Sequence, residues 1–159
     1  SLKDGMKKMS KSDPSDLSRI NLTDEKDEIY NKIKRAKTDP MTMPKDIKDL
    51  VERPEAENLL GIYSSLRNQK LENSINEYSG KQFSEFKEKL SEALIEKIEP
   101  ISKEVKKLLN DEKYLDEILL KGSEKADKIA SKKIKEIKKL VGFWPNILIS
   151  FNYIINHYI

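Results

Sequence analysis

The residues best suited to chemistry lie in a lysine-bearing stretch at the start of the chain, from Gly5 to Pro14. Two lysines three positions apart stand there among small hydroxyl residues: Lys8, Ser10, Lys11 and Ser12. Gly5 ahead and Pro14 behind keep the stretch out of regular helix. A lysine ammonium is a mobile point charge, and hydroxyls and backbone N–H groups add hydrogen bonds to phosphate oxygens. The stretch therefore predicts a loop that folds onto a polyphosphate, and an ordinary solvated lysine loop is the alternative.

The five letters KMSKS, from Lys8 to Ser12, match the second signature of class I aminoacyl-tRNA synthetases. In order and spacing, the surrounding sequence resembles the bacterial and organellar tryptophanyl-tRNA synthetase family. The stretches that carry this resemblance are SDP at 12–14, SRINLTD at 18–24, AKTD at 36–39, RPEAENLLGIY at 53–63, EPI at 99–101, ILLKG at 118–122 and VGF at 141–143. The resemblance covers nearly the whole chain and ends near Phe143.

This resemblance implies a ligase that joins tryptophan to tRNA(Trp) through a tryptophanyl-adenylate and consumes ATP. In that family the KMSKS loop closes over the triphosphate, where ammonium groups stabilise the negative charge that grows in the transition state. Carried over residue by residue, Lys11 is the lysine nearest the reacting phosphates and Lys8 makes a supporting contact. The implied ATP-binding residues are Lys8, Met9, Ser10, Lys11 and Ser12. The resemblance also implies Mg²⁺ that arrives with ATP, a homodimer at full length and a cytoplasmic location.

The composition limits which other chemistry the chain can perform. Charged residues make up 37% of the sequence but the net charge is only +3, which indicates a solvated helical surface rather than a polycation. The absence of cysteine excludes disulfides and cysteine-ligated zinc. Because His157 is the only histidine, a histidine-based metal site or triad cannot form within one chain. We therefore expect no protein-ligated metal. No run of 18 apolar residues occurs, so a membrane is not expected as a partner either.

Three regions are predicted along the chain: residues 1–22 as the KMSKS loop and a connection to a catalytic domain, residues 23–143 as a C-terminal helical domain, and residues 144–159 as an uncharged apolar tail. By the resemblance, the Rossmann-type half with the family's first signature should lie N-terminal to Ser1, together with the tryptophan pocket. The isolated chain is therefore expected to be helical but inactive in tryptophan-dependent pyrophosphate exchange.

Apolar periodicity and helix-capping residues predict a mainly α fold, an antiparallel helical bundle preceded by the loop and a short strand at 18–22. The first helix should follow Thr23 as its N-cap, and the second should begin at Pro54. Breaks are expected at Pro100, at Asn110–Asp111 and at Gly122. The predicted helices are 24–37, 54–66, 71–78, 83–98, 101–109, 114–120 and 124–141.

Lysines recur at spacings of 4, 3, 4, 3 and 4 from just before the last predicted helix to near its end: Lys121, Lys125, Lys128, Lys132, Lys135 and Lys139. At 100° per residue they stay within about 40° of one line. The apolar side chains expected on the opposite, buried face are Ala126, Ala130, Ile134, Ile137 and Val141. The lysine face is either an ordinary solvated surface or a ridge that follows tRNA phosphates. The resemblance favours the ridge, because the family's C-terminal helices approach the anticodon side of tRNA, and the implied contacts are Lys125, Lys128, Lys132, Lys135 and Lys139.

From Trp144 to Ile159 the chain carries no Lys, Arg, Asp or Glu. We expect this tail to be a non-native extension, translated beyond a normal stop or out of frame; an additional core helix or strand is the alternative. For the chain as a whole, two alternatives to a ligase segment stay open. One is a stand-alone helical module that binds tRNA or another protein, and the other is a catalytically inactive fragment.

Overall fold

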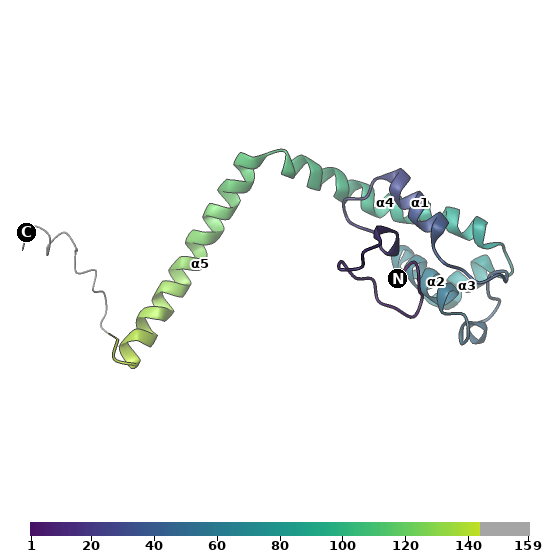
Figure 1. Ribbon diagram of the computed structural model, residues 1–159, viewed down its shortest axis with the longest axis horizontal. Helices are drawn as coiled ribbons and strands as arrows, with labels where there is room; N and C mark the ends of the chain where they lie inside the picture. Colours follow the sequence, from purple (N-terminus) through teal and green to yellow (C-terminus); the bar gives the residue numbers. More distant parts are fainter. Residues whose placement is uncertain (144–159) are drawn as a thin grey trace, which may run out of the picture. The chain divides into compact units, whose positions relative to one another are not determined.

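The computed structural model describes residues 1–143, and the expectations for the tail lie outside these described residues. Within them the protein is mainly α-helical and holds no β-strand (Figure 1), which confirms the predicted fold class. The elements, in chain order, are the 3₁₀-helix η1 (Asp16–Ser18), α1 (Lys26–Arg35), the 3₁₀-helix η2 (Ile47–Leu50), α2 (Pro54–Arg67), α3 (Leu71–Tyr78), α4 (Phe83–Leu109) and α5 (Glu112–Leu140). The chain forms two compact units, Ser1–Lys107 and the part from Leu108 onward. Every helix of residues 1–143 is too short or too polar to span a membrane.

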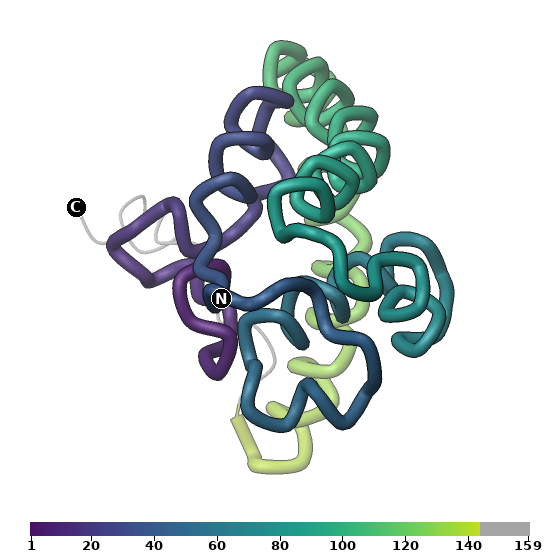
Figure 2. The backbone as a smooth tube through the Cα atoms, turned by 90° about the vertical axis from the view of Figure 1, so that its right-hand side faces the viewer, coloured from purple at the N-terminus to yellow at the C-terminus, as the bar shows by residue number. Residues whose placement is uncertain are grey.

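Helices α1 to α4 of the first unit pack around a single hydrophobic core, and α1 runs beside α4 in this bundle (Figure 2). At its centre three aromatic rings meet edge to face, with centroids 4.9–5.7 Å apart: Tyr63, Tyr78 and Phe86. The Tyr78 hydroxyl donates a hydrogen bond to the Tyr63 hydroxyl at 2.9 Å, and Tyr63 donates to Glu77 at 3.1 Å. Each buried hydroxyl is thereby satisfied, and burial raises the pKa of Tyr78 well above its ordinary value. Tyr63 is thus a core residue of α2.

The predicted strand at 18–22 is wrong. Ser18, its first residue, ends η1, and the chain turns at Leu22–Thr23 before α1 begins. The backbone groups of this stretch bond elsewhere: the Asn21 N–H donates to the Asp24 carboxylate at 2.9 Å, and the Ser18 carbonyl accepts from the Leu2 N–H at 2.9 Å. Thr23 is likewise not the N-cap of α1; Glu25 is, and it forms a reciprocal capping box with Glu28.

The predicted break at Pro100 is also wrong, because α4 continues through it to Leu109. A proline removes one intrahelical hydrogen bond, and contacts to the segment before α1 hold the following turns in place. Ser102 donates to the Thr23 carbonyl at 3.1 Å, Lys106 pairs with Glu25, and Lys103 pairs with Glu99 across Pro100 at 2.7 Å. Tertiary contacts therefore outweigh the local preference of the proline.

Helix α5 runs through Gly122 without the predicted break. One interior glycine costs about 1 kcal/mol relative to alanine, which the helix-forming residues on both sides outweigh. The expected start near Tyr114 is confirmed, since Asp111 caps the helix by accepting from the Tyr114 N–H at 3.1 Å. The expected stop is confirmed too, because Gly142 follows the helix with φ +74°.

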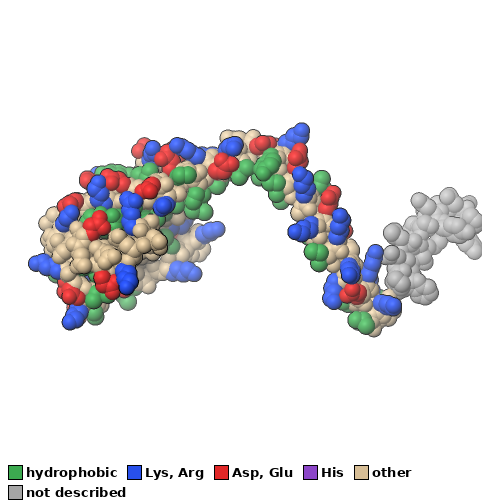
Figure 3. Space-filling view, turned by 180° about the vertical axis from the view of Figure 1, so that it is seen from behind, with side chains coloured by type: hydrophobic (Ala, Val, Ile, Leu, Met, Phe, Trp, Pro, Cys, Tyr) green, Lys and Arg blue, Asp and Glu red, His purple; other side chains and the backbone are tan. Residues whose placement is uncertain are grey.

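The expected buried face of α5 is wrong for the described residues, because none of the helix's residues is buried. Ile134 and Ile137 are 49% and 45% exposed. Lysine and apolar side chains both lie on the surface of this helix (Figure 3). The buried core described here therefore belongs to the first unit.

Replacing either of two glycines in the first unit by alanine should change the free energy of unfolding, but in opposite directions. A Cβ atom on Gly5 would lie inside van der Waals contact with the Pro54 carbonyl and 2.7 Å from the Glu55 nitrogen, whereas one on Gly61 would meet nothing within 4 Å. We expect Gly5→Ala to lower the free energy of unfolding by about 1–3 kcal/mol. Gly61→Ala, inside α2, should raise it by about 0.5–1 kcal/mol.

Urea unfolding of the two variants, followed by circular dichroism, measures both effects. Since Gly61 tests only helix propensity, it is the matched control for the close approach at Gly5. Equal stability of Gly5→Ala and the parent chain would show that the start of the chain does not pack against α2 as described.

Candidate phosphate-binding loop

The predicted loop is closed at its base by the segment that precedes it. The Leu2 N–H donates to the Ser18 carbonyl at 2.9 Å, and the Leu2 carbonyl accepts from the Lys37 N–H, just beyond α1, at 2.7 Å. The Leu2 side chain is only 1% exposed, and Asn58 of α2 donates to the Ser1 carbonyl at 3.2 Å. Residues 3–17 therefore form a loop whose two ends are fixed to the bundle.

Within this loop one side chain packs against the core, and the two lysines of the signature are exposed. Met9 is half-buried and packs against the core, while Lys8 and Lys11 are exposed. Neither lysine forms an ion pair with any residue of the described part of the chain. Ammonium groups without an internal carboxylate partner are free to meet an anionic ligand.

The two serines of the loop bond to each other rather than standing apart. The Ser10 and Ser12 hydroxyls lie 2.8 Å apart, and Ser10 Oγ also accepts from the Ser12 N–H at 3.3 Å. The Asp13 N–H donates to the Ser10 carbonyl at 3.3 Å, which turns the chain after Lys11. All of the predicted ATP-binding residues thus lie on one turned loop, with hydroxyls beside the lysines.

The Arg19 guanidinium contacts the backbone of this loop. Its Nη1 donates to the carbonyl of Asp13 at 3.0 Å and lies 3.5 Å from that of Ser10. Its Nη2 pairs with Asp16 at 3.0 Å, and its Nε donates to the Asn21 side chain at 3.1 Å. A single guanidinium therefore bridges two loop carbonyls and two side chains of the segment that follows.

Lys32 of α1 shares the Asp16 carboxylate with Arg19. The amine is 2.6 Å from Asp24 and 2.6 Å from Asp16, and the Lys32 residue is only 3% exposed. Asn21 links the same two carboxylates, with Nδ2 2.9 Å from Asp16 and 3.1 Å from Asp24. The five side chains Asp16, Arg19, Asn21, Asp24 and Lys32, which we call the loop-support network, join the loop to α1.

Charge pairing sets the protonation states within the loop-support network. Burial alone would lower the pKa of Lys32, but the hydrogen bonds to Asp16 and Asp24 outweigh it and raise that pKa above its ordinary value. The hydrogen bonds from Lys32 and then Asn21 hold the pKa of Asp16 below its ordinary value. The pair of Lys32 and Asp16 is therefore charged across the neutral range.

The sequence prediction missed this network, although one signal was present. Lys32 falls on the same face of its helix as Ile29 and Ile33, and a lysine on an apolar face needs a buried carboxylate. The nearby Asp16 and Asp24 are the candidates of that sign, but the alternation at 18–22 favoured a strand instead. Their side chains lie together only because η1 and the turn before α1 bring them there.

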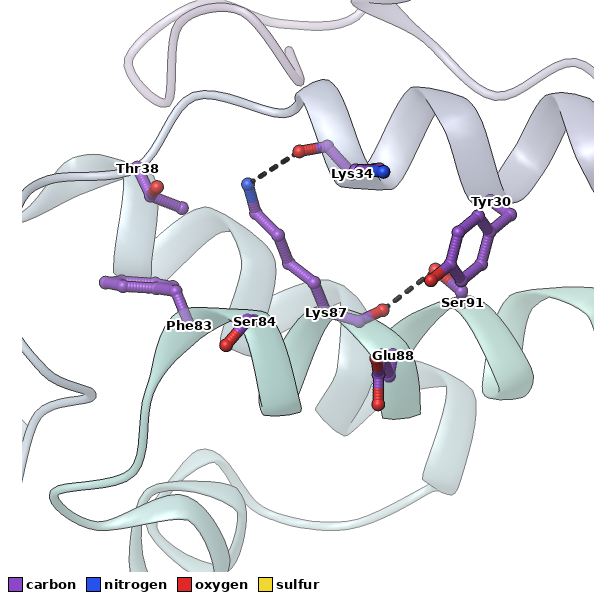
Figure 4. Close-up of a pocket in the computed structure, with 8 residues that line it drawn as sticks. All are labelled: Tyr30, Lys34, Thr38, Phe83, Ser84, Lys87, Glu88 and Ser91. Atoms are coloured by element: carbon purple, nitrogen blue, oxygen red, sulfur yellow. Dashed lines mark hydrogen bonds between the residues drawn. The ribbon is translucent and has the colours of Figure 1, made fainter.

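A hollow of about 420 Å³ lies between α1 and α4 (Figure 4). Lys87 reaches across it and donates to the carbonyls of Ala36 at 2.6 Å and Lys34 at 3.2 Å. These carbonyls belong to the end of α1, which lacks intrahelical partners, and burial lowers the pKa of Lys87. The amine thus closes a helix end, which is a structural task. The hollow is lined by Tyr30, Lys34, Thr38, Phe83, Ser84, Lys87, Glu88 and Ser91.

The lysines predicted to contact tRNA all lie on α5, in the unit that starts at Leu108, and all are exposed: Lys125, Lys128, Lys132, Lys135 and Lys139. Among residues 1–143, no group of three or more His, Cys, Asp or Glu side chains is placed to hold a metal ion.

Comparison with known proteins identifies the family of this chain. The family model for class I tRNA synthetases (W and Y) matches residues 1–99, which include the loop and α1 to α3. The tryptophan–tRNA ligase of Agrobacterium fabrum is 50% identical over 143 residues, which cover 90% of this chain and 40% of that protein. The ligases of Caulobacter vibrioides and Rickettsia felis are 49% and 50% identical over 91% and 90% of this chain, and 42% and 43% of theirs. The chain thus spans about two fifths of the length of these relatives, and it belongs to the family of class I tRNA synthetases (W and Y).

Proposed function

We propose that this chain supplies the KMSKS loop and the C-terminal helical part of a tryptophan–tRNA ligase. The observation that carries the proposal is the pair of exposed lysines on an anchored loop, in a chain about half identical to tryptophan–tRNA ligases over 90% of its length. Such a ligase activates tryptophan with ATP to the adenylate and then transfers it to tRNA(Trp).

In this proposal the loop acts on the triphosphate of ATP. As the tryptophan carboxylate attacks the α-phosphorus, negative charge builds on the α-phosphate oxygens and on the departing pyrophosphate. Lys11 stabilises that charge, and Lys8 makes a supporting contact. Ser10 and Ser12 offer hydroxyls beside them, and Met9 holds the loop to the core. Because the charge is greater in the transition state than in the ground state, these contacts raise the rate rather than only the affinity.

The remaining substrates and partners follow from the same proposal. Mg²⁺ arrives with ATP and is held mainly by phosphate oxygens. Tryptophan occupies a pocket in the nucleotide-binding half, and the complete ligase acts as a homodimer in the cytoplasm. The similarity to the ligases named above supports tryptophan as the amino acid, and the family resemblance of the sequence implies the Mg²⁺, the dimer and the location.

Tryptophan-dependent exchange of pyrophosphate into ATP tests the proposal. A complete ligase that carries residues 1–143 should show the exchange with tryptophan and not with tyrosine. A preparation that binds tRNA but catalyses no exchange with either amino acid would instead favour a helical binding module.

We further propose that the lysines of α5 follow the tRNA backbone. Their exposure on a single helix at regular spacing is what a phosphate-tracking surface needs, and such contacts leave base identity to other residues. In the complete ligase, changing Lys128, Lys132 and Lys135 together to Gln should weaken tRNA binding. The slope of log K against log salt should flatten by up to about one unit per lost phosphate contact. Filter binding at several salt concentrations measures both.

A matched control removes the same charge elsewhere: Lys107, Lys133 and Lys138 changed together to Gln. The first of these lies in α4 and the other two lie off the lysine line of α5. Adenylate formation should be unchanged in both triple variants. If the two bind tRNA with the same affinity and salt slope, the lysine line is an ordinary solvated surface.

A further inference from the structure

Arg19 makes more contacts to the KMSKS loop than any other side chain of the loop-support network. Its guanidinium contacts the carbonyls of Ser10 and Asp13, which lie on either side of Lys11 and Ser12. Both contacts are to backbone atoms, so they fix the path of the chain rather than one side chain. The position of the Lys11 backbone is therefore set by an arginine outside the signature.

The geometry requires an arginine rather than a general positive charge. Three nitrogens of one planar group point in fixed directions to four partners, with Asp16 and Asn21 completing the set. Only 19% of the Arg19 side chain is exposed, so water competes weakly for these hydrogen bonds. A lysine ammonium at the same place is a single point and cannot bridge loop carbonyls and side-chain partners together.

The other partners of Arg19 are themselves held by the core. Asp16 and Asn21 join Asp24, and Asp16 and Asp24 hold the buried Lys32 amine on α1. The contact chain thus runs from the buried Lys32 and Asp24 to Arg19 through Asn21 and through Asp16, whose side chain is 55% exposed.

We propose that Arg19 is a positioning residue that holds the KMSKS loop in the position from which Lys8 and Lys11 contact the phosphates of ATP. This inference rests on the proposed function. Arg19 does not touch the reacting atoms; it reduces the loop's freedom before ATP binds. Displacing catalytic groups by about 1 Å costs roughly 10²-fold in rate, so loss of this anchor should slow adenylate formation.

The first test measures loop motion in the 159-residue chain, and it does not depend on activity. Backbone order parameters from ¹⁵N relaxation should fall from about 0.85 to below about 0.6 at Lys8–Asp13 in Arg19→Ala. Those of α2 and α3 should stay at the parent values, and millimolar guanidinium ion should restore the loop. Unchanged order parameters at Lys8–Asp13 would overturn the proposal.

Arg19→Lys is a second variant, for the case that Arg19→Ala does not fold, since it keeps the charge and the aliphatic stem. It should loosen the loop as Arg19→Ala does, because an ammonium cannot bridge the four partners. The matched control is Arg67→Ala, which removes another arginine with one ion pair, to Glu96, from the same unit. Arg67→Ala should leave the loop unchanged; an equal loss of order there would also overturn the proposal.

The second test uses the complete ligase. Arg19→Ala should lower tryptophan-dependent pyrophosphate exchange roughly 10²-fold, with the KM for tryptophan within about twofold of the parent value. Guanidinium ion should recover part of the rate in Arg19→Ala and have no such effect on Arg67→Ala. A KM for tryptophan that rises as much as kcat falls would indicate general damage and overturn the positioning role.

The two tests distinguish failure of the positioning role of Arg19 from failure of the proposed function. If the parent ligase shows no tryptophan-dependent exchange, the proposed function fails, whereas the order parameters still report whether Arg19 holds the loop. If exchange is normal in the parent and in Arg19→Ala, the positioning role fails alone.

Discussion

Changing Lys11 to Ala in a complete ligase that carries this segment should cost roughly 2–4 kcal/mol of transition-state stabilisation in adenylate formation. Lys11 is exposed and has no ion-pair partner among residues 1–143, so its charge is available to the phosphates. The loss should appear mainly in kcat, because the charge on the α-phosphate and pyrophosphate grows during the reaction. Lys8→Ala should cost less, as a supporting contact.

Pyrophosphate exchange at saturating ATP and tryptophan measures this effect. Lys7→Ala is the matched control: that lysine is one position outside the signature, is exposed, and pairs with Asp4 at 3.4 Å. The control should retain the parent rate. An unchanged rate for Lys11→Ala would remove this residue from the catalytic role.

Changing Lys32 to Met should lower the free energy of unfolding by roughly 3–5 kcal/mol. The methionine fills much of the same space, but Asp24, whose side chain is 5% exposed, loses its cationic partner. An uncompensated buried carboxylate costs far more than an intact buried pair contributes, so removing one partner is the severe change. The loop-support network should then lose its connection to α1.

Urea unfolding of the 159-residue chain provides the measurement, with Lys34→Met as control. Lys34 lies on the same helix with an exposed side chain, and its replacement should change stability by less than about 0.5 kcal/mol. Because the pKa of Lys32 is raised, its contribution is fully present below the ordinary lysine pKa and is lost as pH rises through the raised value. On the alkaline side, the gap between the unfolding free energies of the parent and Lys32→Met should therefore narrow only in strongly alkaline solution. On the acid side it should narrow once the carboxylates are protonated, because the pKa of Asp16 is held below its ordinary value. Equal stability at neutral pH would contradict the buried pair.

Local signals predicted the fold where no tertiary contact opposed them. Pro54 begins α2 and α3 spans residues 71–78, both as expected, and Gly80 lies just beyond α3 with φ +71°. A first-turn proline and a glycine after a helix both depend on backbone geometry alone. The helix breaks predicted at Pro100 and Gly122 were wrong. Neighbouring contacts support α4 beyond Pro100, and the propensity of a long helix outweighs Gly122. A breaker's effect thus depends on contacts that a single sequence does not display.

The candidate site was predictable in part for the same reason. The signature KMSKS is contiguous, so its residues were identified together, and the structure places them on one exposed loop. The loop-support network is assembled from residues up to sixteen positions apart, Asp16 to Lys32, which come together through a 3₁₀-helix and a turn. Motif spacing therefore indicated the candidate ligand-binding groups but not the groups that hold them.

The half-buried Met9 gives the loop a chemical weakness. This side chain packs the lysine-bearing loop against the core. Oxidation by peroxide would convert its thioether into a polar sulfoxide, which disrupts packing against apolar residues. The anchor between Lys8 and Lys11 would then be lost without any change in charge. In the proposed ligase, oxidation of this one sulfur atom would thereby slow adenylate formation, and a methionine sulfoxide reductase would reverse the damage.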